Sequence, residues 1–259
     1  MANLLLSMIQ ATSQFSPNGL TGTVLWLDAN DTSTMSLNGS NLCASWGNKG
    51  SVPLGSAATQ GTDARKPTYV PNVQNGKGVL RFASGQILDL GNNNYLPTNS
   101  AWTIFMTVGN RSFGVSGTKY LILFSNVIAT NTGSPIVMSN DTGYRYLALG
   151  QNGTQVTQRT TTVIGAEYYN FSWQYGGSNP TTAGSYTLTL KGSSNSLTSS
   201  GGLSGFTSNN SSVGGEASQI NTTFCFNGDI CEIIVYNYAL TAGQITSVNN
   251  YLKNKWGLS

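Results

Sequence analysis

The stretch FNGDICEIIVYN, residues 226–237, decides the fold of this chain. A strand drawn through it has apolar residues on both faces. One face carries Ile230, Ile234 and Tyr236, and the other carries Cys231, Ile233 and Val235. Because a strand that is covered on both faces lies inside a layered protein, we predict a central strand and not a solvent-exposed edge.

The next stretch, residues 241–256, has the signals of an amphipathic helix at both ends. Thr241 and Gln244 have the spacing of a capping box, in which each side chain binds the backbone of the other residue. Gly257 suits the left-handed position just beyond a helix. An apolar stripe recurs at steps of three and four, at Ile245, Val248, Leu252 and Trp256. We predict that this helix packs on one flank of a β-sheet.

The middle of the chain alternates between apolar and polar residues, as half-buried antiparallel strands do. The pattern is clearest at residues 102–108, 168–175 and 186–190, and Asn-Gly pairs supply turns between strands. Residues 191–223 are rich in Gly, Ser and Asn, and we expect a surface connection with one short strand near Val213. Many short strands and one terminal helix favour an all-β fold, a two-sheet antiparallel jelly-roll sandwich.

These segments resemble concanavalin A-like, laminin-G-like jelly-roll domains of the kind found in bacteriophage virion proteins. The terminal strand and helix carry the resemblance, together with VLWLDA at residues 24–29, WGNKG at 46–50 and GVLRF at 78–82. The resemblance spans about residues 21–259 and implies the same sandwich fold. It does not fix the function, since this fold occurs in lectins, glycanases, adhesins and structural modules.

The composition indicates a neutral polar surface on an ordered core. Only 8% of residues are charged, whereas 10% are aromatic. The net charge is +3 and the basic residues are scattered, so no clustered basic face indicates nucleic-acid binding. The apolar run at residues 4–9 is too short to span a bilayer, so we expect no membrane partner.

The sequence lacks the usual catalytic groups, and we expect no enzyme. It contains no His, which removes the common general base and the common metal ligand. Its glutamates, Glu167, Glu216 and Glu232, do not form the carboxylate cluster that glucanases of the resembling family carry. Asp28 and Asp31 have the spacing of turn or capping residues.

The cysteines predict free thiols and a cytoplasmic site of synthesis. Cys43, Cys225 and Cys231 lack metal-site spacing, and neither strand arrangement of the last two suits a disulfide. Relatives often bind Ca²⁺, but Cys231 stands where they often have Asp. Asp229 is therefore the remaining candidate calcium ligand, and we expect no other cofactor.

Aromatic side chains beside amides and carboxylates are the candidates for binding sugar. Four tryptophans fall on apolar faces and are assigned to the core, namely Trp26, Trp102, Trp173 and Trp256. Trp46 and Tyr95 lie near Asn- and Gly-rich turns and are expected to be exposed. Tyr144 and Tyr146, with Asn140 and Asp141, form the candidate glycan site.

Residues 1–20 form an apolar N-terminal arm, and residues 21–259 form the jelly-roll domain. The arm is a strand or turn of its own domain, a segment that docks on a neighbouring subunit, or an uncleaved signal. The leading expectation is a non-enzymatic bacteriophage virion surface protein, either a capsid decoration or a tail-fibre adhesin. It would be a homo-oligomer that binds virion proteins through the arm and a cell-surface glycan. The alternatives are an extracellular lectin-like module and, more distantly, a glycoside hydrolase.

Overall fold

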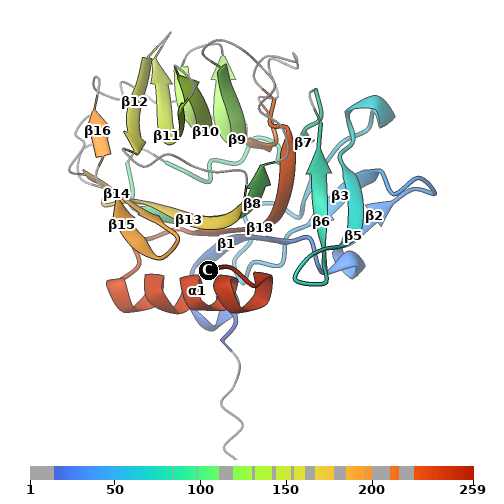
Figure 1. Ribbon diagram of the computed structural model, residues 1–259, viewed down its shortest axis with the longest axis horizontal. Coiled ribbons are helices and arrows are strands. Elements are labelled where there is room, and N and C mark those ends of the chain that lie inside the picture. Colours follow the sequence, from blue (N-terminus) through green and yellow to red (C-terminus); the bar gives the residue numbers. More distant parts are fainter. Residues whose placement is uncertain are drawn as a thin grey trace, which may run out of the picture.

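A computed structural model describes most of the chain. The described residues are 15–83, 85–97, 99–110, 119–129, 132–141, 144–152, 155–160, 167–177, 185–195, 197–199, 211–215 and 225–259. Two antiparallel sheets pack face to face, and one helix lies against the outer side of the first sheet (Figure 1). This confirms the predicted all-β, jelly-roll-like sandwich with a C-terminal helix.

The first sheet, sheet A, has the order β15-β14-β13-β8-β18-β6-β5, and β1 also pairs with β18. Its strands are β1 (Thr23–Asp28), β5 (Thr68–Gln74), β6 (Lys77–Phe82), β8 (Trp102–Asn110), β13 (Tyr168–Tyr175), β14 (Tyr186–Leu190), β15 (Ser193–Asn195) and β18 (Gly228–Tyr236). The terminal strand β18 thus lies between β8 and β6, in the middle of the sheet, as its two apolar faces predict.

The second sheet, sheet B, has the order β16-β12-β11-β10-β9-β17-β7-β4-β3-β2. Its strands are β2 (Met35–Leu37), β3 (Cys43–Gly47), β4 (Ala57–Thr59), β7 (Leu88–Asp89), β9 (Lys119–Ala129), β10 (Thr132–Asp141), β11 (Tyr144–Asn152), β12 (Gln155–Thr160), β16 (Leu197–Ser199) and β17 (Ser211–Val213). Short 3₁₀ turns are η1 (Pro17–Gly19), η2 (Thr32–Thr34) and η3 (Asp63–Arg65). The strand expected near Val213 is β17, but β15 and β16 precede it.

The main core lies between the sheets and is supplied by alternate residues of the long strands. β8 contributes Trp102, Ile104, Met106 and Val108, β13 contributes Tyr169, Phe171, Trp173 and Tyr175, and β14 contributes Tyr186, Leu188 and Leu190. The alternation read from the sequence is confirmed for these three strands.

In β18 the predicted faces are wrong at one end. Ile230 belongs to the core between the sheets with Ile233 and Val235, whereas Cys231 lies on the outer face with Ile234. The cause is an irregularity in the pairing with β8 between Ile230 and Glu232, which shifts the register. A bulge of this kind breaks the strict alternation of a strand, so residues on its two sides exchange faces.

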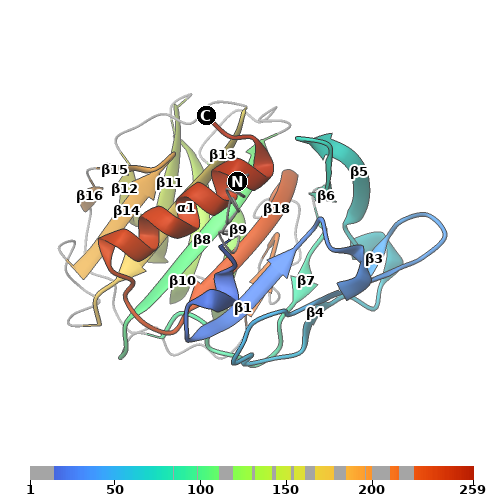
Figure 2. The ribbon, with the colours of Figure 1, turned by 90° about the horizontal axis from the view of Figure 1, so that it is seen from below.

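The helix α1 (Ala242–Trp256) has the predicted caps. Thr241 and Gln244 bind one another's backbone in a capping box, and Gly257 adopts a left-handed conformation with φ of 61°. The helix lies across the outer face of sheet A, over β13 and β8 (Figure 2). Its buried residues Val248, Leu252 and Trp256 form a second core with that face, and the predicted apolar stripe is confirmed.

Two aromatic residues that the sequence placed near the surface are buried instead. Trp46 has no exposed surface, and Tyr95 is 1% exposed. Trp46 lies on β3, between β2 and β4 in sheet B, and its side chain belongs to the core between the sheets. Nearby Asn and Gly residues indicate turns, but they do not set the direction of a neighbouring strand side chain.

The described part of the predicted arm, residues 15–20, lies on the domain. Pro17 is buried, and its carbonyl oxygen accepts a hydrogen bond of 3.1 Å from the Tyr236 hydroxyl. Phe15 and Leu20 pack against the second core. Residues 1–14, which carry the apolar run, are outside the described residues. The cysteines Cys43, Cys225 and Cys231 are free and buried, as expected.

Candidate functional site

Glu232 is the centre of a buried polar network beneath α1. Its Oε1 accepts hydrogen bonds from Trp26 Nε1 at 2.7 Å and from the Tyr251 hydroxyl at 2.9 Å. Its Oε2 accepts from Trp256 Nε1 at 2.7 Å and binds Lys255 Nζ at 2.9 Å. Burial raises the pKa of Glu232, and the Lys255 ammonium acts in the opposite direction. Both oxygens are therefore fully used by partners from β1 and α1.

Lys255 is the second fully used group. Its ammonium contacts Glu232, Asp28 Oδ1 at 2.8 Å and the Tyr251 hydroxyl at 3.0 Å. An ammonium has three N–H donors, so each one has a partner. The network fastens the last turn of α1 to β1 and β18, and this role requires no ligand.

Asp28 and Asp31 both form ion pairs with Lys49. Its Nζ lies 3.1 Å from Asp28 Oδ2 and 2.7 Å from Asp31 Oδ2, and 4.3 Å from the centre of the Trp26 ring. Burial works to lower the pKa of Lys49, but its hydrogen bonds to Asp31 and Asp28 raise it. The hydrogen bond from Lys49 lowers the pKa of Asp31. Asp28 also accepts a backbone hydrogen bond from Asn30, as a turn aspartate does.

A shallow groove, which we call the α1 groove, runs beside this network. It consists of two adjoining hollows of about 240 and 410 Å³ that share Phe15 and Tyr251. The smaller hollow is lined by Phe15, Ser247, Asn250, Tyr251 and Asn254. The larger is lined by Phe15, Ser16, Trp26, Asp28, Lys49, Lys77, Tyr251 and Lys255.

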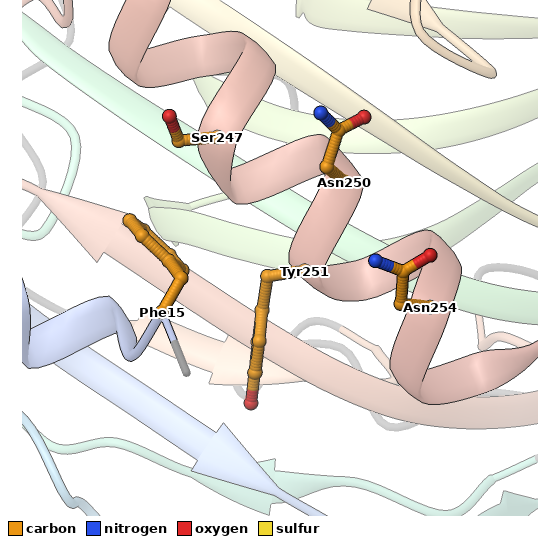
Figure 3. Close-up of a pocket in the computed structure, with 5 residues that line it drawn as sticks. All are labelled: Phe15, Ser247, Asn250, Tyr251 and Asn254. Atoms are coloured by element: carbon orange, nitrogen blue, oxygen red, sulfur yellow. The ribbon is translucent and has the colours of Figure 1, made fainter. Parts of the chain in front are cut away.

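The helix supplies one wall of the smaller hollow. Ser247, Asn250, Tyr251 and Asn254 follow steps of three and four, so they share a face of α1 (Figure 3). Phe15, from the segment before β1, packs beside Tyr251 with the ring centres 5.8 Å apart. Asn250 and Asn254 are exposed, and their side-chain amides have no hydrogen-bond partner in the described part of the chain.

This groove was not predicted from the sequence. The apolar stripe of the helix predicts its buried face, whereas the groove uses the neighbouring stripe, whose SxxNYxxN pattern places one aromatic ring among polar side chains. That pattern was available as a signal. The contact with Phe15 was not, because it joins segments that are distant in the sequence.

The candidate glycan residues predicted from the sequence lie together in the β10–β11 hairpin. The pairing puts Asp141 directly opposite Tyr144, and Tyr146 opposite Ser139. Asn140 is instead the partner of Arg145. The backbone thus brings Asp141 and Tyr144 together, while Asn140 lies one position along. The side chains of this hairpin are outside what the structure describes, so the site remains a prediction.

Asp229, the candidate calcium ligand, forms an ion pair. Arg81 Nε lies 2.7 Å from its Oδ1 and Arg81 Nη2 lies 2.9 Å from its Oδ2, and the Tyr168 hydroxyl donates to Oδ2. Asp229 is fully buried. Nowhere in the described ranges do three or more His, Cys, Asp or Glu residues group as metal ligands would. Calcium binding at Asp229 remains a prediction.

The glutamates occupy separate places. Glu167 is exposed and pairs with Lys191 at 2.5 Å, whereas Glu232 is sealed beneath α1. Glu216 is outside the described residues. The expectation that the protein is not an enzyme is not tested by this geometry. Among the described residues, no helix has the length and apolar character needed to cross a membrane.

The comparisons with known proteins show the fold. No family model and no curated protein sequence matches the chain. Trypanosoma rangeli sialidase in complex with 2,3-difluoro-KDN superposes with a TM-score of 0.59 and 15% identity, over 97% of this chain and 36% of the sialidase. The chain thus spans about a third of that protein.

Two further structures are similar. One is domain 4 of AbnA, a GH43 extracellular arabinanase from Geobacillus stearothermophilus, in complex with arabinotriose. It has a TM-score of 0.56 and 15% identity, over 88% of this chain and 98% of that domain. The other is the binding domain of botulinum neurotoxin serotype D/C, with a TM-score of 0.53 and 12% identity, over 94% of this chain and 56% of the toxin domain. At these identities the likeness establishes a shared β-sandwich architecture.

Proposed function

We propose that the protein is a non-enzymatic glycan-binding module and that the glycan lies in the α1 groove. The observation that carries the proposal is the Phe15–Tyr251 ring pair beside the amides of Asn250 and Asn254, which have no hydrogen-bond partner among the described residues. Small-molecule sites combine apolar and aromatic surface with a few polar groups that fix orientation. Sugar rings match that combination, since they have an apolar face and a hydroxyl edge.

The fold supports the same function class. A domain of this architecture from an arabinanase was solved with arabinotriose bound, and another belongs to a sialidase. Fold alone does not imply function. The specific chemistry therefore has to come from the groove, which offers the amides of Asn250 and Asn254 next to aromatic rings. The hydroxyls of Ser247 and Tyr251 already donate to Gly243 and Glu232.

The experiment is a glycan array followed by calorimetry on the best ligand. We compare the native chain with three double or single variants, N250A/N254A in the groove, Y144A/Y146A in the β10–β11 hairpin, and T246A. Thr246 is exposed on α1 but does not line the groove, so T246A is the matched control. Loss of binding in N250A/N254A alone supports the groove.

The other outcomes separate the alternatives. Loss of binding only in Y144A/Y146A would assign the site to the hairpin and overturn the groove. Absence of binding to every glycan on the array would overturn the glycan-binding function itself. Circular dichroism and thermal melting of each variant check that the fold is intact.

We infer that the setting of this module is the surface of a bacteriophage virion. The support is the 8% content of charged residues, the three free and buried cysteines, and the apolar run at residues 4–9. Buried free thiols fit a chain that folds in a reducing cytoplasm. Residues 1–14 would dock on a virion protein or on another copy, since exposed apolar segments mark contact sites.

The test of this setting is deletion of residues 1–14. The cut precedes Phe15, Pro17 and Leu20, which pack on the domain, so the fold should survive. The expected result is a folded domain that no longer oligomerises or enters particles, measured by light scattering and by particle incorporation. Normal assembly of the truncated chain would overturn docking through the arm.

A further inference from the structure

Charged side chains line the larger hollow of the α1 groove. Asp28 lies deep, with its side chain 7% exposed, and Lys49, with its side chain 23% exposed, lies nearer the surface. Asp31, which also binds Lys49, has a side chain that is 31% exposed, so Lys49 already has two carboxylate partners. An anion that enters the hollow therefore needs a cation that is not already paired.

The lysines differ in how many ion-pair and hydrogen-bond partners their ammonium groups already have. Lys255 has three partners in the buried network, and Lys49 holds Asp28 and Asp31. Lys77 also lines the hollow, and in the described part of the chain its ammonium has no ion pair or hydrogen bond. Among the described residues that line the hollow, Lys77 is therefore the cation without a partner that can bind an anion.

A tight hairpin holds Lys77 in position. Asn75 and Gly76 turn β5 into β6 with positive φ angles of 50° and 69°, as the two-residue turn of a hairpin requires. Gln74 Nε2 donates to the Trp256 carbonyl at 2.7 Å, and Asn75 Nδ2 donates to the Lys255 carbonyl at 3.0 Å. These hydrogen bonds hold the turn against the end of α1, and they therefore fix the position of the backbone next to Lys77.

The direction of Lys77 follows from the alternation of β6. Val79 lies on the outer face of sheet A in the core beneath α1, and Lys77 precedes it by two residues on the same face. Lys77 thus lines the same hollow as Tyr251 and Phe15.

We propose that the α1 groove binds an acidic saccharide, a sugar of the uronic-acid class, and that Lys77 binds its carboxylate. This inference rests on the proposed glycan-binding function and adds the chemical class of the ligand. The ring of the sugar packs on Tyr251 and Phe15, the amides of Asn250 and Asn254 bind hydroxyls, and the carboxylate reaches Lys77. A carboxylate and an ammonium form a charge-assisted hydrogen bond, which is stronger than a neutral one.

The probes are matched pairs of short oligosaccharides with and without charge. We use oligomers of galacturonate, of mannuronate and guluronate, and of hyaluronan, each together with its methyl ester. The ester keeps the sugar ring and removes the charge. Calorimetry at low and high salt measures the affinity of each pair for the native chain, for K77A and for K253A. Lys253 lies on α1 but does not line the groove, so K253A is the matched control.

The expected result is that one acid binds about tenfold more tightly than its ester, a ratio typical of a hydrogen bond to a charged group. K77A removes that difference and leaves the affinity for the ester unchanged, whereas K253A keeps the difference. High salt weakens the acid more than the ester, because exposed charges are screened.

Four results would overturn the inference. An ester that binds as tightly as its acid, or an acid preference that survives K77A, removes the role of Lys77. If neutral glycans bind the groove but none of the acids does, the ligand class is wrong and the proposed function stands. If no glycan of either kind binds, the proposed function fails together with the inference.

Discussion

Lys255 Nζ lies 2.9 Å from Glu232 Oε2, and this contact joins the last turn of α1 to the central strand β18. Glu232 is fully buried, and the Lys255 side chain is 11% exposed. A buried ion pair contributes little by itself, but removing one partner leaves the other charge uncompensated. The pair therefore makes the docking of the helix depend on single residues.

We predict that Glu232→Gln destabilises the protein by about 3–5 kcal/mol. The variant keeps the shape of the side chain but has one acceptor oxygen, and its NH₂ group faces donors from Trp26, Trp256 or Tyr251. Urea unfolding measures the free energy. Glu167→Gln is the control, because it breaks an exposed pair whose contribution is about 0–1 kcal/mol. Equal stability of both variants would show that the network does not hold the helix.

We predict a comparable loss, about 3–5 kcal/mol, for Trp256→Ala. Trp256 is fully buried at the end of the apolar stripe of α1, and the substitution empties that site. Trp256→Phe separates packing from hydrogen bonding, since it keeps an aromatic ring and loses the donor to Glu232, which costs about 1–3 kcal/mol. An unchanged melting temperature in Trp256→Ala would mean that the helix is not docked.

The features that sequence reasoning predicted depend on neighbours within a few residues. The capping box of Thr241 and Gln244 lies within a span of four positions, and the alternation of β8 and β13 repeats every second residue. The residues that produce each pattern lie close together in the sequence. The strands, the helix and the layered fold could therefore be predicted without knowing the tertiary structure.

The features that it missed depend on contacts between distant segments. The irregularity between Ile230 and Glu232 is visible only through the register with β8. Trp26 reaches Glu232 across 206 positions of sequence, which no periodic pattern records. The contact of Phe15 with Tyr251, which forms the candidate site, is of the same kind. Function is harder to predict than fold here, because the groove is assembled by such contacts.

We predict that the protein releases no reducing ends from β-glucans, arabinans or sialosides. The sequence has no His, and in the described residues Glu167 and Glu232 are held by Lys191 and by the buried network. Most glycosidases use two carboxyl groups that flank the scissile bond, whereas sialidases use a Tyr nucleophile. A reducing-sugar assay with long incubation measures turnover. Activity that Glu167→Gln or Glu232→Gln abolishes in a folded variant would establish an enzyme.

The last prediction concerns alkaline pH. Burial raises the pKa of the Cys43 thiol from 9.0 to about 11, and burial also raises the pKa of Cys231. The folded chain therefore holds these protons more tightly than the unfolded chain. Below pH 9 the thiols are protonated in both states and add no pH dependence. Between pH 9 and about 11 the unfolded state ionises first, so the free energy of unfolding falls as pH rises.

Urea unfolding across this pH window measures the fall. Burial raises the pKa of Tyr95 to about 12, so tyrosines extend the same trend to higher pH. Cys43→Ala should make the fall between pH 9 and 11 shallower, because it removes one of the titrating thiols. Thr246→Ala, which changes an exposed residue of α1 that has no titrating group, should leave the slope unchanged. Stability that stays constant over the window, or an identical slope in Cys43→Ala, would contradict the link between burial and the retained proton.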